Sequence, residues 1–94
     1  MPYIKKEYRE DYDPIISSLV DEIYIQNIKN KCGSLNYIIS TLLLKAYGKD
    51  LSSYVIYNEI IGILECAKLE FYRRFVSEYE DKKILENGDI VLKD

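Results

Sequence analysis

Two pairs of carboxylates have the spacing that places acidic side chains on one face of a helix. Glu7 and Glu10 form the first pair, and Glu78 and Asp81 form the second. Residues three apart are neighbours on a helix surface, and two such carboxylates suit Mg²⁺, which prefers oxygen ligands. Most of the chain separates the two pairs, however, and both lie at the edges of the helical segments. Solvated charge is therefore the interpretation that we favour.

Paired motifs of this kind, E-x-x-E and E-x-x-D, are also used by all-helical nucleotide pyrophosphohydrolases to hold metal ions on neighbouring helices. This resemblance implies an alternative function, a small metal-dependent pyrophosphohydrolase. The distance between the two pairs in this sequence argues against it. We therefore favour a role without catalysis, and we assign no catalytic residue, no metal ligand and no cofactor.

The chain has no His, and its two cysteines, Cys32 and Cys66, have no neighbouring Cys. Zinc sites made of His and Cys are thereby excluded, as is catalysis by Ser–His or Cys–His pairs. Isolated cysteines of cytosolic proteins usually stay reduced and pack as small apolar groups. We expect two free thiols, with Cys32 the more reactive because it precedes a glycine in a predicted loop.

Residues 68–74 combine aromatic side chains with three cations, a mixture that can stack on bases and hold phosphate. Glu70, however, stands one helical turn before Arg73 and Arg74, at the spacing of salt bridges within a helix. The net charge of −3 also opposes nucleic-acid binding, which depends on a basic surplus. Ion pairing within the helix is the interpretation that we favour, and we expect no nucleic-acid partner.

Apolar periodicity predicts an all-α fold with three main helices, over about residues 14–30, 35–47 and 54–80. The first begins at Asp13-Pro14, because Asp is a good N-cap and Pro suits the first helical position. Cys32 to Ser34 separate it from the second helix, which Ser34 caps and Gly48 ends. A helix-turn-helix motif is disfavoured, because the next loop is long and the third helix starts with apolar residues.

The third helix is the longest and has two apolar faces when projected at about 100° per residue. The bulky face should pack on the first two helices; it contains Ile56, Tyr57, Ile60, Ile63, Leu64, Ala67, Phe71 and Phe75. The opposite face, small or apolar at its centre, contains Val55, Asn58, Gly62, Cys66, Leu69 and Arg73. A glycine inside a helix costs about 1 kcal/mol relative to Ala. Gly62 is explained by simple tolerance of this cost, by a tight crossing within the chain, or by the close approach of a partner helix.

The chain should form a single domain over residues 1–94, with a short C-terminal extension after the turn signal at Asn87-Gly88. No apolar run is long enough for a membrane span, and the first residues do not resemble a signal peptide. We therefore expect a cytoplasmic protein with no membrane partner. Abundant Ile, Lys and Glu beside a single Gln favour a thermophilic source, archaeal or viral.

Three segments together resemble a small uncharacterised family of archaea, bacteria and their viruses, whose members have about the length of this chain. They are residues 35–43, which contain LNYII, residues 58–74, NEIIGILECAKLEFYRR, and residues 79–89, which contain YEDKKI. The resemblance covers nearly the whole chain. It implies one domain and no assigned activity.

These observations favour a helical interaction or structural protein that associates with itself. The bulky face of the third helix has cover within the chain, whereas no further long helix remains for the opposite face. We expect a homodimer in which two third helices cross antiparallel near Gly62 and Cys66, with Arg73 close to acidic groups such as Glu59 of the partner subunit. If that face does not pair, the N-terminal segment with its tyrosines at positions 3, 8 and 12 is the next candidate to cover it.

Overall fold

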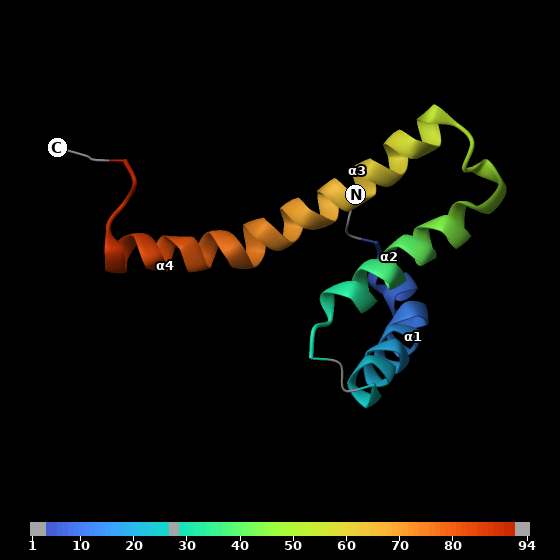
Figure 1. The fold of residues 1–94 in the computed structure, drawn as a ribbon, viewed down its shortest axis with the longest axis horizontal. Coiled ribbons are helices and arrows are strands. Elements are labelled where there is room, and N and C mark those ends of the chain that lie inside the picture. The colour runs from blue at the N-terminus through green and yellow to red at the C-terminus, as the bar shows by residue number, and fades with distance from the viewer. Residues whose placement is uncertain (1–3, 27–28, 92–94) are drawn as a thin grey trace. The chain divides into compact units, whose positions relative to one another are not determined.

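The computed structural model describes residues 4–26 and 29–91, and every regular element within them is helical. The elements are α1 (Lys6–Ile25), α2 (Cys32–Tyr47), the 3₁₀ helix η1 (Gly48–Asp50), α3 (Tyr54–Phe71), the π-helical segment η2 (Tyr72–Val76) and α4 (Ser77–Asn87) (Figure 1). Since α3, η2 and α4 follow one another without a break, they form one helix of 34 residues. The predicted all-α fold with three main helices, the third longest, is confirmed.

Helix α1 begins at Lys6, so the predicted start at Asp13-Pro14 is wrong and Pro14 lies inside the helix. Backbone N–H groups of the first turn donate to the carbonyl oxygen of Lys5. An internal proline loses one helical hydrogen bond and costs about 3 kcal/mol. The carbonyl that loses its partner belongs to Glu10, an exposed residue whose backbone water can solvate. Lys, Glu and Arg, all strong helix formers, precede the proline and extend the helix across it.

The connection between α1 and α2 also differs from the prediction. Helix α1 ends at Ile25 instead of residue 30, and residues 27–28 lie outside the described part of the chain. Helix α2 begins at Cys32, and Ser34, the predicted cap, lies within its first turn. The N-cap position is Lys31, which makes no side-chain cap hydrogen bond. Asn30, one residue earlier, satisfies a free N–H of the first turn, because its Oδ1 accepts a hydrogen bond from the Cys32 backbone N–H at 2.9 Å.

Two glycines end helices, and the sequence predicts this role for Gly48 and only a turn for Gly88. Gly48 follows α2 with φ +50°, and Gly88 follows α4 with φ +88°, both in a region that other residues rarely adopt. The long helix continues to Asn87, seven residues beyond its predicted end. Its last turns contain good helix formers and an ion pair between Lys83 and Glu86 at 3.0 Å.

The chain divides into two compact units at the Ile60–Ile61 bond. Within the first unit, Ile23 of α1 is the one buried side chain among the described residues, at 9% exposure. Ile38 of α2 and Ile56 and Ile60 of α3 are half-buried. A groove of about 440 Å³ is formed by α1 and α2. It is lined by Leu19, Glu22, Ile23, Gln26, Gly33, Ser34, Tyr37 and Ile38.

The second unit consists of the remainder of α3, then η2, α4 and a C-terminal extension. None of its described side chains is buried. Residues 89–91 of the extension form no strand, and Leu92, the end of the expected extended segment, lies outside the described residues. Within the described ranges, no helix combines the length and the apolar character needed to cross a membrane.

The positive φ of Gly48 gives a test of the fold. Replacing Gly48 with Ala should lower the free energy of unfolding by about 1–3 kcal/mol, because a side chain at this φ is strained. Gly33→Ala is the matched control. It lies in the first turn of α2 with nothing within 4 Å of an added Cβ, so it should be neutral or stabilising. Urea unfolding followed by circular dichroism measures both, and equal effects would contradict the assigned α2 end.

Candidate functional site

The six residues predicted to form an interface follow one another along α3 into the start of η2. We call Val55, Asn58, Gly62, Cys66, Leu69 and Arg73 the small-residue face. All six are exposed, with Val55 at 71% and Leu69 at 55%. Apart from its chain neighbours and its own helix backbone, no atom of the described residues lies within 4 Å of a Cβ built on Gly62, so close packing among those residues does not explain this glycine. Arg73 pairs with Glu70 of the same helix at 3.0 Å.

The bulky face of the long helix departs from the prediction in its second half. Ile56 and Ile60 are half-buried in the first unit, as expected for residues that pack within the chain. Phe71 and Phe75, which the prediction packs on the first two helices, belong to the second unit, and there they are 62% and 61% exposed. Their ring centroids are 5.1 Å apart, so the two rings contact each other. The long helix therefore presents an exposed aromatic surface that sequence reasoning assigned to the core.

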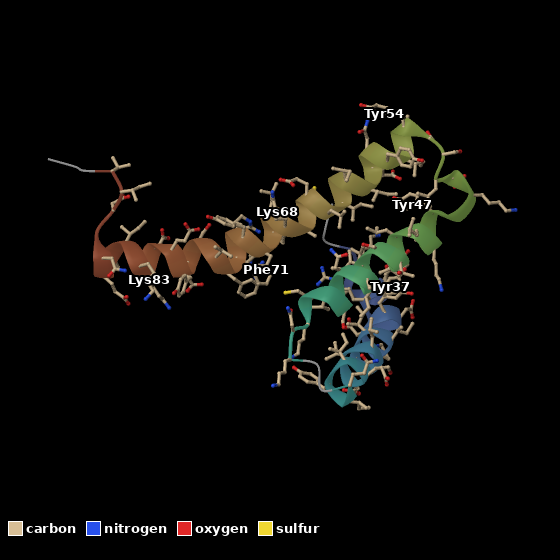
Figure 2. The ribbon with its side chains drawn as sticks, in the orientation of Figure 1. Tyr37, Tyr47, Tyr54, Lys68, Phe71 and Lys83 are labelled. Carbon is tan, nitrogen blue, oxygen red and sulfur yellow. The ribbon has the colours of Figure 1, made fainter. Side chains whose placement is uncertain are left out.

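The π-helical segment determines which residues join this surface. Phe71, Phe75, Tyr79 and Lys83 are spaced by four, and three such steps would rotate about 120° around a regular α-helix. A π-type turn takes in one additional residue, which reverses about 100° of that rotation. Lys83 Nζ lies 5.5 Å from the Tyr79 ring centroid, and Figure 2 shows Phe71 and Lys83 on the same side of the helix. We call Phe71, Phe75 and Tyr79 the aromatic stripe.

A hydrogen bond across the π-helical segment accompanies this alignment. The Tyr72 hydroxyl donates to the carboxylate of Glu80, eight residues later. In a regular helix, residues eight apart differ by about 80° around the axis, and the additional residue of η2 removes that difference. This hydrogen bond raises the pKa of Tyr72 above its ordinary value. In the first unit, a hydrogen bond to Glu59 raises the pKa of Tyr47 in the same way.

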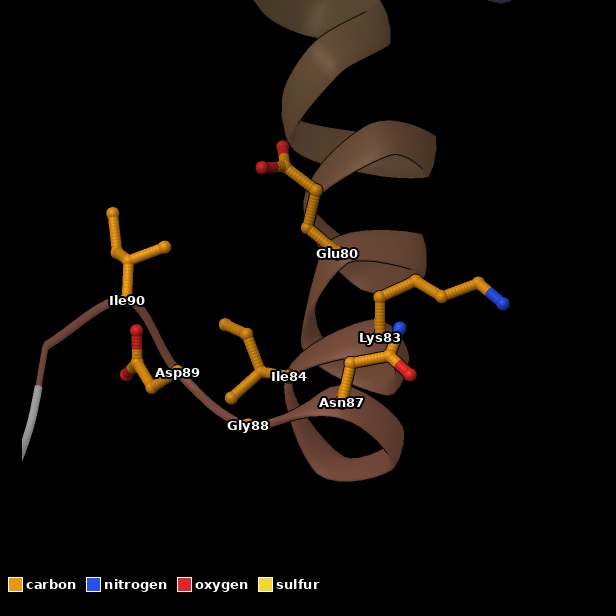
Figure 3. Close-up of a pocket in the computed structure, with 7 residues that line it drawn as sticks. All are labelled: Glu80, Lys83, Ile84, Asn87, Gly88, Asp89 and Ile90. Atoms are coloured by element: carbon orange, nitrogen blue, oxygen red, sulfur yellow. The ribbon is translucent and has the colours of Figure 1, made fainter.

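A hollow of about 360 Å³ lies at the C-terminal end of α4, where the chain turns at Gly88 (Figure 3). Its three charged side chains already have partners within the chain. Glu80 accepts from Tyr72, Lys83 pairs with Glu86, and Asp89 Oδ1 accepts from the Val91 backbone N–H at 3.2 Å. Figure 3 shows the Lys83 side chain pointing away from Asp89 and Ile90. The hollow therefore follows from the way the chain turns at the end of α4, and we assign no reaction to it.

The carboxylate pairs of the sequence belong to different units, Glu7 and Glu10 to the first and Glu78 and Asp81 to the second. Within residues 4–26 and 29–91, no group of three or more Asp, Glu, Cys or His side chains is placed to hold a metal ion. Both cysteines are free thiols, and both are exposed. Burial within the single chain therefore does not distinguish the two thiols, and the predicted order of their reactivity stays a prediction.

Comparison with known protein families identifies the family of this chain. A family model described as a domain of unknown function, DUF6899, matches residues 1–90. The chain belongs to this family. Comparisons with curated proteins and with solved structures gave no match. Membership of DUF6899 agrees with the resemblance to an uncharacterised family and assigns no activity.

The bond between Tyr72 and Glu80 predicts a pH-dependent contribution to stability. A raised tyrosine pKa means that the folded state favours the protonated hydroxyl. The contribution should be complete below the unfolded pKa, about 10, and should disappear as pH rises through the folded pKa. Tyr72→Phe should therefore lower the melting temperature at neutral pH and leave it unchanged at strongly alkaline pH. Tyr54→Phe, at a residue 77% exposed, is the control, and an equal effect of both variants would contradict the assignment.

Proposed function

We propose that this DUF6899 protein is a helical interaction protein that associates with further copies of itself and forms most of its apolar core between copies. The support comes from the second unit, which is one helix with apolar side chains on more than one side. A helix that is apolar on all sides is normally buried within a larger structure. A single helix cannot bury its own apolar side chains, so a partner is needed to cover them.

The exposed apolar area of the second unit is large enough for such an association. Eight large side chains contribute to it: Ile61, Ile63, Leu64, Leu69, Phe71, Tyr72, Phe75 and Tyr79. Their exposures run from 38% to 63%. At about 150–250 Å² for an aromatic side chain and less for an aliphatic one, they expose roughly 800 Å² together. One partner contributes about this area to a stable interface of standard size.

The small-residue face is the proposed contact. Gly62 and Cys66 have no long side chains, so two helices can approach closely there, and Leu69 supplies apolar area at the edge. A twofold axis between two antiparallel helices brings the same face of each copy together. Arg73 then approaches acidic groups near the start of the partner's α3, of which Glu59 is one. A close helix crossing also explains why position 62 is a glycine, whereas packing among the described residues of one chain does not.

Enlarging Gly62 tests this contact. Gly62→Leu should weaken association by about 5- to 150-fold, because overpacking a close contact costs about 1–3 kcal/mol. Gly62→Ala is the matched control, since it adds one methyl group and improves helix propensity by about 1 kcal/mol. Sedimentation velocity at about 100 μM detects interfaces stronger than about 5.5 kcal/mol. A wild-type monomer at that concentration would contradict self-association, and an unchanged mass of Gly62→Leu would contradict this contact.

The reactivity of the two thiols gives an independent test. Both thiols are exposed in the single chain, so a monomer should lose them at similar rates. In the proposed assembly Cys66 is covered and Cys32 is not. A thiol reagent should therefore modify Cys32 first, and dilution should accelerate the reaction of Cys66. Rates of Cys66 modification that do not depend on protein concentration would refute a crossing at Cys66.

A further inference from the structure

A four-residue repeat runs through the second half of the long helix. Each repeat begins with a charged residue, and the charges alternate in sign. We call Glu70, Arg74, Glu78 and Lys82 the charge ladder. Each ladder residue immediately precedes position 71, 75, 79 or 83. The first three of these positions are the aromatic stripe. Because η2 keeps this four-residue spacing on one side of the helix, the ladder runs beside the stripe.

The ladder also stabilises the single helix, since residues four apart pair on a helix surface. Arg74 Nη1 lies 3.7 Å from Glu70 Oε1. Such exposed pairs contribute only about 0.3–0.5 kcal/mol each. Pairing within the helix leaves the neighbouring aromatic stripe unexplained, because its three rings remain 60–62% exposed. Three exposed aromatic rings beside an ordered row of charges are typical of an interface, whose centre is rich in aromatic residues.

We propose that the aromatic stripe and charge ladder form a second self-pairing surface, on which another copy of this chain docks antiparallel about a twofold axis level with Val76. This inference rests on the proposed self-association and concerns a surface other than the small-residue face. The axis level follows from the ladder, because 76 is the midpoint of 70 and 82 and also of 74 and 78. Glu70 then faces Lys82 of the partner subunit, and Arg74 faces Glu78 of the partner subunit.

The sign sequence of the ladder selects the antiparallel orientation. Read forward it is negative, positive, negative, positive, and read backward it is the reverse. An antiparallel copy therefore places an opposite charge against every ladder residue, four ion pairs in total. A parallel copy in the same register places like charges against each other, which is unfavourable. The aromatic rings alternate in the antiparallel arrangement, since the partner's rings at positions 71, 75 and 79 lie level with positions 81, 77 and 73 of the first chain.

Charge reversal separates pairing between copies from pairing within one helix. Arg74→Glu or Glu78→Arg alone should weaken association through this surface about tenfold or more, because each converts two attractive pairs into repulsive ones. The double variant Arg74→Glu with Glu78→Arg should recover to within about threefold of wild type, because opposite charges again face each other across the axis.

The same double variant is unfavourable within one helix. Its ladder reads negative, negative, positive, positive, which places like charges four residues apart at both ends. Circular dichroism should show helicity no higher than in the single variants. Recovery of association without recovery of helicity supports the surface. Association no stronger than in the single variants would overturn it, because pairing within the helix would then explain the ladder completely.

Cysteine cross-linking tests the orientation. One chain carries Arg74→Cys and another carries Glu78→Cys, both with Cys32→Ser and Cys66→Ser. Mild oxidation of the mixture should give the mixed disulfide, because antiparallel pairing brings position 74 of one copy against position 78 of the other. Disulfides only between like chains would indicate parallel pairing, and their absence altogether would exclude contact here. Either result overturns the proposal.

The two proposals fail in different ways. If the wild-type chain is monomeric at about 100 μM, both the proposed self-association and this second surface are refuted. If Gly62→Leu disrupts the oligomer and the ladder variants leave it unchanged, only the proposal of the second surface is refuted. An oligomer that the single ladder variants disrupt and the double variant restores supports it, whatever the effect of Gly62→Leu.

Discussion

A single α-helix cannot bury its own side chains, and this constraint governs the second half of the molecule. From Ile61 onward the described chain is one helix followed by a short extension, and none of its side chains is buried. What stabilises it locally is modest: ion pairs such as Lys68–Glu65 at 2.9 Å and the glycine at its end. Helical stability in proteins comes mainly from packing an apolar face against another element. Burial of the exposed rings and aliphatic side chains of this unit by a partner would therefore stabilise its fold.

The π-helical segment is the local irregularity that makes such packing productive. Its i→i+5 turns have poorer geometry than α-helical ones and are found most often at functional sites. Here the additional residue keeps Phe71, Phe75 and Tyr79 on one side and brings the Tyr72 hydroxyl to Glu80. A regular helix would have distributed the same four-residue repeat around its circumference. The additional residue thus keeps side chains that recur every four residues on one side of the helix. In a regular α-helix these side chains would drift around the axis.

Apolar periodicity was sufficient to predict the fold class and the three helices, and Gly48 was predicted to end the second of them. Boundaries failed where local chemistry decided them. Helix formers extended α1 across Pro14, and α2 begins at Cys32, whose backbone N–H the Asn30 side chain satisfies. The small-residue face could be listed from the sequence because α3 is regular there. The aromatic stripe could not, because a projection at constant angle contains no signal for the residue added in η2. Periodicity also placed Phe71 and Phe75 on an apolar face without identifying what covers that face.

The two proposed surfaces limit the assemblies that this chain can form. Both are antiparallel, but the crossing at Gly62 and Cys66 lies about twelve residues, or roughly 18 Å, along the helix from the axis level with Val76. Two parallel twofold axes that do not coincide combine into a translation. A straight helix that used both surfaces at once would therefore extend into an open array, as contacts without closure generally do. A closed oligomer requires either axes that intersect or one surface at a time. In the second case the charge ladder and the small-residue face compete for the same partner. Salt favours the small-residue face, because the ladder depends on four ion pairs that salt screens, whereas the centre of the small-residue face is packed around Gly62 and Cys66.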